Sequence, residues 1–181
     1  PLWIRLDKLN IPVVYFNNKG TGDSEWDYVA SDNYQGGRLV ANRLMEAGKT
    51  PCAFVSNMDE SKVETDRLKG FSDTLKSAGF PPPTLINIEM FEGNKPPNIR
   101  AMLGECKGIF AINDSTAIGM LTRLRNEGIS VPGECGVIGF DDSELCEHVV
   151  PRLDSVRQQS RFMGERTAEL MIRRLENHDV M

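Results

Sequence analysis

Short polar side chains follow three apolar segments of the sequence, and they are the residues best suited to small-molecule chemistry. The three positions carry Asn57, Met58, Asp59 and Glu60; Asn113, Asp114 and Ser115; and Asp141, Asp142 and Ser143. Arg67 follows the first of these positions by a few residues. A guanidinium, an amide and a carboxylate together offer planar donors and mixed donor–acceptor groups, which suit a polyhydroxylated or heterocyclic ligand. The set contains no nucleophile paired with a general base.

Each of these residues also has a purely structural interpretation. Asn113 can cap a helix that begins at Ser115, and it can do so while also binding a ligand. Asp141 or Asp142 can close an Asx turn. Arg67 can pair with a glutamate on the surface of its own helix. The residue types alone therefore leave binding and structural roles open.

The sequence patterns of common enzymes and metal sites are missing. There is no G-x-S-x-G nucleophile elbow, no G-x-x-x-x-G-K-[ST] phosphate loop and no G-x-G-x-x-G after a predicted strand. The four cysteines form no C-x-x-C pair, and the two histidines are distant from any pair of them. We therefore expect no metal site and no cofactor. Cys52 and Cys135 lie in apolar segments, and we interpret them as buried thiols of a reducing cytoplasm.

Short apolar segments alternate with longer amphipathic ones along the chain. Strands are predicted over Ile11–Phe16, Tyr28–Ala30, Cys52–Ser56, Leu85–Glu89, Gly108–Asn113 and Val137–Phe140. Helices are predicted over Asn33–Ala47, Lys62–Ala78, Ser115–Glu127 and Arg161–Leu175, and a glycine follows each of the first three. This alternation predicts an α/β fold whose parallel sheet is covered by helices on both faces. Ligands of such folds bind beyond the carboxyl ends of the strands.

The composition is that of a folded globular protein. The 181 residues are 40% hydrophobic and 26% charged, which suffices for one domain or two small lobes. The net charge of -5 argues against a chain that grips DNA or RNA by itself, because phosphate binding needs a positive surface. No apolar run approaches the roughly 20 residues of a membrane span, and Pro1–Asn10 lacks the pattern of a signal segment. We expect a piece of a longer chain, because the first predicted strand lacks its neighbours.

Several short motifs occur in a fixed order along the chain. The most specific stretch comprises Gly108–Gly119, Val131-Pro132 and Val137–Asp142. The others are Ile11–Val14, Val29–Asn33 with Gly36-Gly37, Arg67–Phe71, and Pro151–Val156 with Gln158. Together they resemble the effector domain of LacI/GalR-family transcription regulators. The departures from the family pattern are Asp154-Ser155 in place of Thr-Thr and Lys49-Thr50 in place of His-Arg.

The resemblance implies a periplasmic-binding-protein-like fold of type I. In that fold, two α/β lobes with parallel sheets are joined by three crossover strands and hold the ligand between them. Residues 1–30 would then belong to an incomplete N-terminal lobe, residues 31–159 would form the C-terminal lobe, and residues 160–181 would return to the first lobe. The family's DNA-binding head and first strands have no counterpart in this sequence, so the resemblance does not identify the ligand.

The resemblance also implies which residues bind. Carried over position by position, Arg67, Asn113 and Asp141 correspond to ligand-binding residues, and Gln158 lies at the return crossover facing the cleft. Family sites often place an aromatic residue near Phe91, although an aromatic residue after a strand more often belongs to the core. No catalytic residue and no cofactor is implied.

A second set of positions resembles the family's homodimer contact. It consists of Ile118 and Thr122 on one predicted helix, together with the segment near Val149. Ile118 has an alternative interpretation as an ordinary residue at the edge of the core. We expect a dimer through these positions.

The expected function is allosteric sensing in the cytoplasm, without enzyme activity. A sugar, a sugar phosphate or a purine-like molecule would bind and change the DNA affinity of a helix-turn-helix head that this sequence lacks. Two alternatives stay open. A sugar-binding protein of a transporter would share the fold but would carry an export signal. A small-molecule enzyme on a doubly wound sheet would need the missing nucleophile–base pair.

Overall fold

A computed structural model of the chain describes residues 11–17, 27–59, 61–92 and 96–178. By its contacts the chain divides into two units. The first unit comprises Pro1–Asp32, Ser61–Val63 and Gln159–Met181, and the second comprises Asn33–Glu60 and Glu64–Gln158. The predicted boundaries at residues 31 and 160 lie within two residues of the main divisions, whereas the short segment 61–63 was not expected in the first unit.

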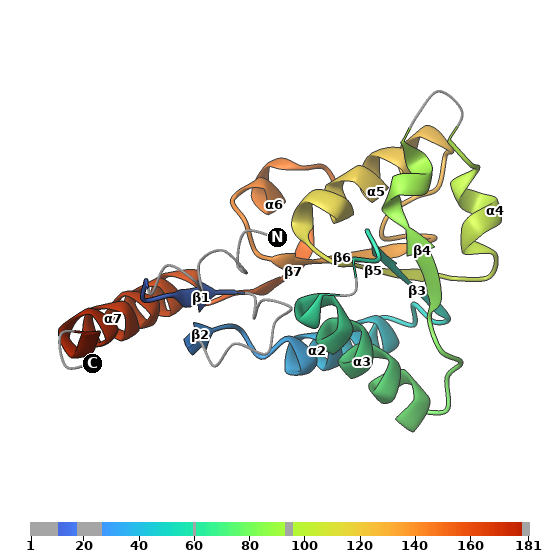
Figure 1. The fold of residues 1–181 in the computed structure, drawn as a ribbon. Helices are drawn as coiled ribbons and strands as arrows, with labels where there is room; N and C mark the ends of the chain where they lie inside the picture. The colour runs from blue at the N-terminus through green and yellow to red at the C-terminus, as the bar shows by residue number, and fades with distance from the viewer. Residues whose placement is uncertain (1–10, 18–26, 60, 93–95, 179–181) are drawn as a thin grey trace. The chain divides into compact units, whose positions relative to one another are not determined.

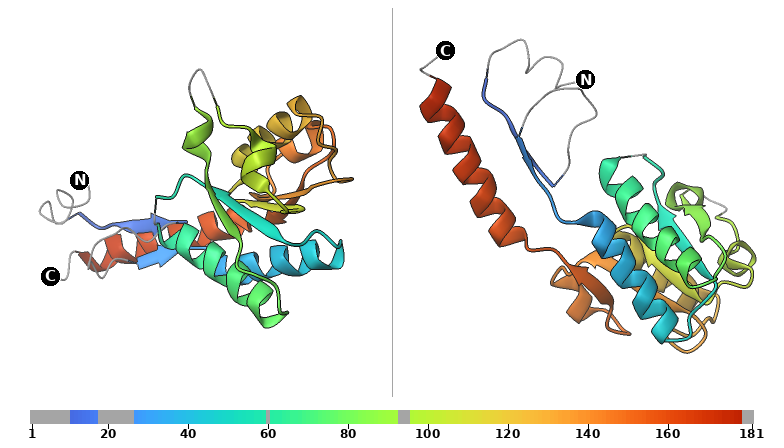
Figure 2. Two further views of the ribbon diagram at one scale, coloured as in Figure 1. Left: turned by 90° about the vertical axis from the view of Figure 1, so that its right-hand side faces the viewer. Right: turned by 90° about the horizontal axis from the view of Figure 1, so that it is seen from below.

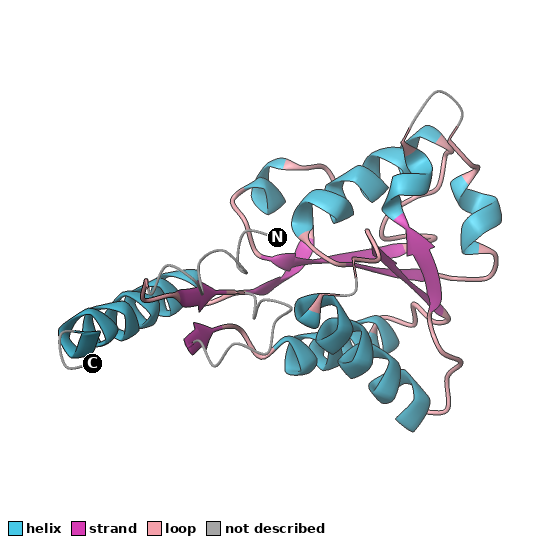
Figure 3. Ribbon diagram, viewed as in Figure 1, coloured by secondary structure: helices cyan, strands magenta, loops and turns pink. Residues whose placement is uncertain are grey.

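The second unit is built on a parallel five-stranded sheet (Figures 1 and 3). Its strands are β3 (Cys52–Ser56), β4 (Thr84–Asn87), β5 (Gly108–Ala111), β6 (Gly136–Asp141) and β7 (Asp154–Arg157). Their order across the sheet is β4-β3-β5-β6-β7. The apolar segments of the sequence predict four of these strands. They miss β7, an edge strand whose end residues are exposed and polar and which therefore lacks a continuous apolar run.

Helices cover both faces of this sheet, as Figure 1 shows. On one face lie α2 (Asn33–Glu46) and α3 (Lys62–Ser77), and on the other lie α4 (Ile99–Leu103), α5 (Asp114–Asn126) and α6 (Leu145–His148). The short helix η1 (Ile88–Phe91) follows β4. Three predicted helix ends are confirmed, since Gly48, Gly79 and Gly128 follow α2, α3 and α5 with φ of 65°, 83° and 69°. Only glycine adopts this left-handed conformation without strain.

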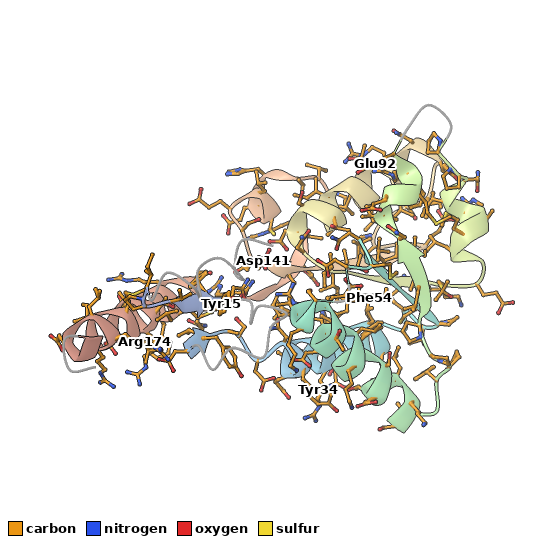
Figure 4. All side chains as sticks on the ribbon, viewed as in Figure 1. Tyr15, Tyr34, Phe54, Glu92, Asp141 and Arg174 are labelled. Atoms are coloured by element: carbon orange, nitrogen blue, oxygen red, sulfur yellow. The ribbon has the colours of Figure 1, made fainter. Side chains whose placement is uncertain are left out.

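Alternating residues of the strands form two separate cores, one on each face. In β3, Cys52 and Phe54 join the cluster under α2 and α3, whereas Ala53 and Val55 join the cluster under α4 and α5. Phe54, labelled in Figure 4, meets the ring of Phe110 edge-on at 5.2 Å. This period of two is the reason that a strand buried on both faces has a continuous apolar sequence.

The first unit consists of a short parallel pair of strands and one long helix. The strands β1 (Val14–Phe16) and β2 (Asp27–Val29) pair in parallel, and α7 (Ser160–His178) lies alongside them (Figure 2). The Arg174 Nε donates to an oxygen of Asp27 at 2.7 Å and ties α7 to β2. Among the described residues, no helix combines the length and the apolar character that crossing a membrane requires.

Candidate ligand-binding site

Arg67 is the central residue of the candidate site, and neighbouring groups hold its guanidinium from several directions. It extends from α3, and the residue is only 2% exposed. Its Nε donates to Oδ1 of Asn33 at 2.9 Å, and its Nη1 donates to the Ile112 carbonyl oxygen. The guanidinium carbon lies 3.5 Å from the ring centroid of Phe140, which is cation–π geometry. Arg67 is therefore buried among these groups and does not form the surface ion pair within its own helix that the sequence also allowed.

Two glycines allow the helix that carries Arg67 to reach this position. A Cβ atom on Gly37 of α2 would lie 2.1 Å from the Arg67 carbonyl oxygen, and one on Gly70 of α3 would lie 2.0 Å from the Tyr34 carbonyl oxygen. Neither position therefore accepts a side chain without moving backbone. Tyr34, labelled in Figure 4, lies on α2, so the two helices touch through their backbones. This close contact fixes Arg67 relative to Asn33, which begins α2.

Asp141 supplies the carboxylate at the end of β6. Its Oδ1 lies 3.9 Å from Nη2 of Arg67, and it accepts a hydrogen bond from Nε2 of Gln158. The side chain of Asp141 is 41% exposed, whereas that of Arg67 is 3% exposed, so the carboxylate is the more accessible member of the pair. Figure 4 labels Asp141 at this end of the sheet. Three of the residues predicted to bind a ligand are therefore brought together.

Burial shifts the pKa of both charged partners. Burial lowers the pKa of Arg67 to about 10, and the carboxylates of Asp141 and Asp114 oppose that shift. Burial also raises the pKa of Asp141 above its ordinary value, while the Gln158 hydrogen bond and the charge of Arg67 lower it. Because a pKa near 10 leaves Arg67 protonated at neutral pH, the site presents a permanent cation beside a carboxylate that resists ionisation.

The backbone around Asp141 is strained. Asp141 and Asp142 have φ of 117° and 55°, values that non-glycine residues rarely adopt. Such residues cost of the order of 1–3 kcal/mol each and persist where the surroundings hold them, often at functional sites. The Asp142 carboxylate pairs with Nε of Arg157. Only the first of the two adjacent acids is therefore left for Arg67 and Gln158.

The structure shows one of the two roles that the sequence left open for Asn113, namely the helix cap, and it leaves part of the amide available for the other. Its Oδ1 accepts the backbone N–H of Thr116 at 2.8 Å, so it caps α5, which begins at Asp114 rather than at Ser115. Among the described residues its Nδ2 has no hydrogen-bond partner. It directly follows Ile112, whose carbonyl accepts from Arg67. The amide group therefore keeps two donors for a ligand beside the guanidinium.

Phe91 does not join these residues. It is 5% exposed and lies in the core cluster on the α4 and α5 face. The guanidinium carbon of Arg123 lies 4.9 Å from its ring centroid, and the Arg123 Nη2 donates to its carbonyl oxygen at 3.4 Å. The expectation of an aromatic ligand contact at this position is wrong for this structure, because the ring fills the core instead.

The donor set does not resemble a metal site. Among residues 11–17, 27–59, 61–92 and 96–178, no three side chains of His, Cys, Asp or Glu are grouped to hold an ion. The four cysteines are free thiols, and Cys52, Cys135 and Cys146 are buried. Burial raises the pKa of Cys52 and Cys135 to about 12, so these thiols are not nucleophiles at neutral pH.

Comparison with known proteins identifies the family. Residues 41–180 match the model of a periplasmic binding protein-like domain. The chain is 31% identical to the HTH-type transcriptional regulator CelR of Thermobifida fusca, over 97% of this chain and 53% of that protein. The chain belongs to the LacI/GalR family of transcriptional regulators. It spans about half the length of the curated relatives it matches.

Solved structures of LacI-family regulators share the fold. The complex of the transcriptional regulator CelR with cellobiose has a TM-score of 0.85 and 28% identity, covering 98% of this chain and 56% of that one. A LacI-family regulator from Enterococcus faecalis with bound ribose has a TM-score of 0.79 and 28% identity, covering 96% of this chain and 62% of that one. The predicted α/β, periplasmic-binding-protein-like fold is therefore confirmed for this LacI-family chain.

Two buried polar residues of the second unit were not predicted. Asn33 was expected only as the start of a helix, and Glu64 only as a surface partner for Arg67. Glu64 is 5% exposed and accepts the Ser56 hydroxyl at 2.6 Å and the Asp59 backbone N–H at 2.9 Å. Burial raises the pKa of Glu64. One feature of the sequence could have indicated these two residues, because both are polar residues at helix positions that face a sheet.

The predicted dimer residues occupy neighbouring elements of the second unit. Ile118 is partly buried against the core, and Thr122, one turn later on α5, is exposed and donates to the Ile118 carbonyl oxygen at 3.2 Å. Val149 follows α6 and is partly buried. Arg125 of α5 donates to the Val150 carbonyl oxygen and thereby connects the two elements.

Proposed function

We propose that this LacI/GalR-family chain senses a small polyhydroxylated molecule, a sugar in the first instance, through Arg67, Asn113, Asp141 and Gln158. Binding would favour one conformation of the regulator over another and thereby change its affinity for DNA. Couplings of this kind are typically about 1–3 kcal/mol. The DNA-binding part would lie elsewhere in the whole protein, and the site of action would be the cytoplasm, where the DNA is. The proposal includes no catalytic step.

The observation that carries this proposal is a guanidinium that is almost fully buried yet lies beside a half-exposed carboxylate. The Nε and Nη1 groups of Arg67 donate hydrogen bonds to Asn33 and Ile112. The remaining donors of the guanidinium lie on the side of Asp141. Asn113 adds amide donors, and Asp141 adds acceptors. Vicinal hydroxyl groups both donate and accept, so they match this arrangement better than an apolar or a purely anionic ligand does.

The solved relatives support the ligand class. One LacI-family neighbour was solved with cellobiose and another with ribose. Both ligands are neutral and rich in hydroxyl groups. The loss of one hydrogen-bonding partner in such a site costs roughly 1–3 kcal/mol, because the partner groups of the ligand stay buried and unsatisfied.

A panel of compounds tests the proposal directly. Thermal shift and isothermal titration calorimetry would compare cellobiose, ribose, galactose, glucose 6-phosphate and guanine on the 181-residue chain. We expect at least one sugar to raise the Tm, since a ligand at 100 times its Kd stabilises by about 2.7 kcal/mol. Stabilisation by guanine alone would redirect the proposal to a purine-like effector, and no shift with any of the five compounds would reject it.

We also propose that the chain forms a homodimer through Ile118, Thr122 and Val149. Support comes from the way Arg125 connects α5 to the segment after α6, which makes one continuous surface of exposed and half-buried residues. Ile118→Glu would place a charge in that surface, and we expect sedimentation at half the wild-type mass. Arg166→Glu on the exposed face of α7, in the first unit, is a control for a change of surface charge. Equal sedimentation of Ile118→Glu and wild type would contradict the dimer.

A further inference from the structure

A buried carboxylate that does not belong to the proposed ligand contacts holds the turn after β6. Asp114, the first residue of α5, is 2% exposed. Its Oδ2 accepts the Ser143 backbone N–H at 2.7 Å, and its Oδ1 accepts the Ser155 hydroxyl at 2.5 Å. The Ser155 Oγ in turn accepts the Asp142 backbone N–H at 3.0 Å. The Ser143 N–H therefore donates directly to the Asp114 carboxylate, and the Asp142 N–H is linked to the same carboxylate through the Ser155 hydroxyl.

The sheet leaves space for this carboxylate. A Cβ atom on Gly139 of β6 would lie 2.4 Å from Oδ1 of Asp114 and 3.2 Å from its Cα. Any larger residue at this position would push the carboxylate away from Ser155. The close approach of Asp114 thus explains why a glycine lies in the middle of this buried strand, and no unusual backbone conformation of Gly139 is needed.

The location of Asp114 at the start of a helix does not account for its contacts. An acid in the first turn interacts favourably with the helix dipole. However, the cap of α5 is Asn113, and both Asp114 oxygens accept donors from residues outside α5. The contacts of Asp114 therefore serve the segment after β6 and the strand β7, which are distant from it in sequence.

This network acts on the strained backbone of the candidate site. Asp141 and Asp142 both have positive φ, and such conformations persist only where neighbouring groups hold them. The same conformation directs the Asp141 carboxylate toward Arg67 and Gln158. We propose that Asp114 and Ser155 are positioning residues, which fix the turn and thereby hold the Asp141 carboxylate where a ligand meets it. The consequence for ligand binding rests on the proposed function, whereas the fixing of the turn does not.

A matched pair of substitutions isolates the Ser155 hydroxyl. Ser155→Val and Ser155→Thr give side chains of nearly the same size and shape, but only threonine keeps the hydroxyl. By NMR, we expect the Asp142 amide to exchange with solvent at least tenfold faster in Ser155→Val than in Ser155→Thr. The amides of β5 should exchange equally in both. The pKa of Asp141, followed by its carboxyl ¹³C shift, should fall toward the ordinary value in Ser155→Val, because the released carboxyl regains water.

Two further variants test the carboxylate and the specificity of the effect. Asp114→Ala removes both acceptors, so the Asp142 and Ser143 amides should both exchange at least tenfold faster. Ser130 provides a control at the opposite end of the sheet, where its hydroxyl and its carbonyl oxygen accept the Glu134 backbone N–H at 3.1 Å and 2.9 Å. Ser130→Val should leave the Asp142 and Ser143 amides unchanged, because it removes a hydroxyl at the other end of the sheet.

The outcomes separate positioning from general stabilisation and from the proposed function. Equal Asp142 exchange in Ser155→Val and Ser155→Thr, or an equal acceleration of the β5 amides, would overturn the proposal. Calorimetry with cellobiose should then show at least tenfold weaker binding for Ser155→Val than for Ser155→Thr. Neither the amide exchange nor the pKa measurement uses a sugar. A wild-type chain that binds no sugar would therefore reject the proposed function and leave the positioning result standing.

Discussion

The two ends of the sheet in the second unit differ in how deeply their charged groups are buried. At the carboxyl end, Arg67 and Asp114 are each 2% exposed and are hydrogen-bonded on several sides. At the amino end there is a hollow of about 840 Å³, but its charges are solvated. The Lys49 Nζ donates to the Gly133 carbonyl oxygen at 2.6 Å on the surface, and Arg100 lies 3.7 Å from an exposed glutamate.

This difference shows that the burial of polar groups, rather than the size of a hollow, distinguishes the end where we propose the ligand site. Burying an ion costs several kcal/mol unless other groups compensate it, and hydrogen bonds from Arg67 to Asn33 and Ile112 provide that compensation at the carboxyl end. The amino end has a simpler explanation. The helices α2 and α4 end there at Gly48 and Gly104, and a lysine beside helix C-termini offsets their partial negative charge.

The largest expected effect is that of Arg67→Ala, which removes the centre of the carboxyl-end cluster. We expect cellobiose affinity to fall at least a hundredfold, because the ligand loses a charged donor and Asp141 loses its cation. We also expect the free energy of unfolding to fall by about 2 kcal/mol, since the partners on Asn33 and Ile112 become unsatisfied. Calorimetry and urea unfolding measure the two effects.

Lys49→Ala is the matched control at the amino end. It also removes a cation and a hydrogen bond, but at a partly exposed position. Its affinity for cellobiose should equal that of wild type. If Lys49→Ala weakened binding as much as Arg67→Ala, the contrast between the two ends of the sheet would be broken.

The second prediction concerns the helix contact that supports the carboxyl end. Gly37→Ala would bring a methyl group to 2.1 Å from the Arg67 carbonyl oxygen, where only backbone movement gives relief. We expect a loss of about 2–3 kcal/mol in urea unfolding, together with weaker sugar binding. Gly119→Ala on α5 is the control, because its new methyl meets only the flexible end of Arg123 at 3.4 Å. It should gain about 0.5–1 kcal/mol from helix propensity. If Gly37→Ala and Gly119→Ala were equally stable, the contact between α2 and α3 would be loose enough to accept a methyl group.

The sequence predicts local features of this chain better than contacts between distant residues. Strand β3 and the helix ends at Gly48, Gly79 and Gly128 follow from residue patterns within a few positions. The edge strand β7 could not be found in that way, because its pairing with β6 supplies the energy that its own residues lack.

The candidate site shows the same limit. Polar residues after strands lead to Asn113 and Asp141, because the carboxyl ends of parallel strands meet at one edge. The partner of Arg67 is 34 positions away, and that of Asp114 is 41 positions away. No local pattern specifies such pairs. Phe91 fails for the converse reason, since an aromatic residue after a strand fits a core and a ligand surface equally well.

A smaller effect is expected for Asn113→Ser, which separates the two roles of that amide. Serine caps a helix about as well as asparagine, so the free energy of unfolding should change by less than about 0.5 kcal/mol. The ligand would lose its amide donor, and cellobiose affinity should fall about tenfold. Asn113→Ala should lose the same affinity and about 1 kcal/mol of stability as well. If Asn113→Ser bound cellobiose like wild type, the residue would be a cap only.

The smallest expected effect is a difference in pH dependence between the two ends. Burial raises the pKa of Asp141 above 3.8, so the folded state binds its proton more tightly than the unfolded state does. The stability that Asp141 contributes, relative to Asp141→Asn, is therefore greatest at low pH and declines as pH rises from 3.8 through the raised pKa. Hydrogen bonds from the Ser130 backbone and hydroxyl lower the pKa of Glu134 below 4.5.

The stability that Glu134 contributes, relative to Glu134→Gln, consequently has the opposite sign of slope. It is present above pH 4.5 and is lost as pH falls through the lowered pKa. Urea unfolding of the two variants and wild type between pH 3 and pH 7 would compare these slopes. Parallel slopes would show that the two carboxyl groups have equivalent surroundings. Opposed slopes require that Asp141 is desolvated in the folded state while Glu134 is a solvated acceptor of a turn.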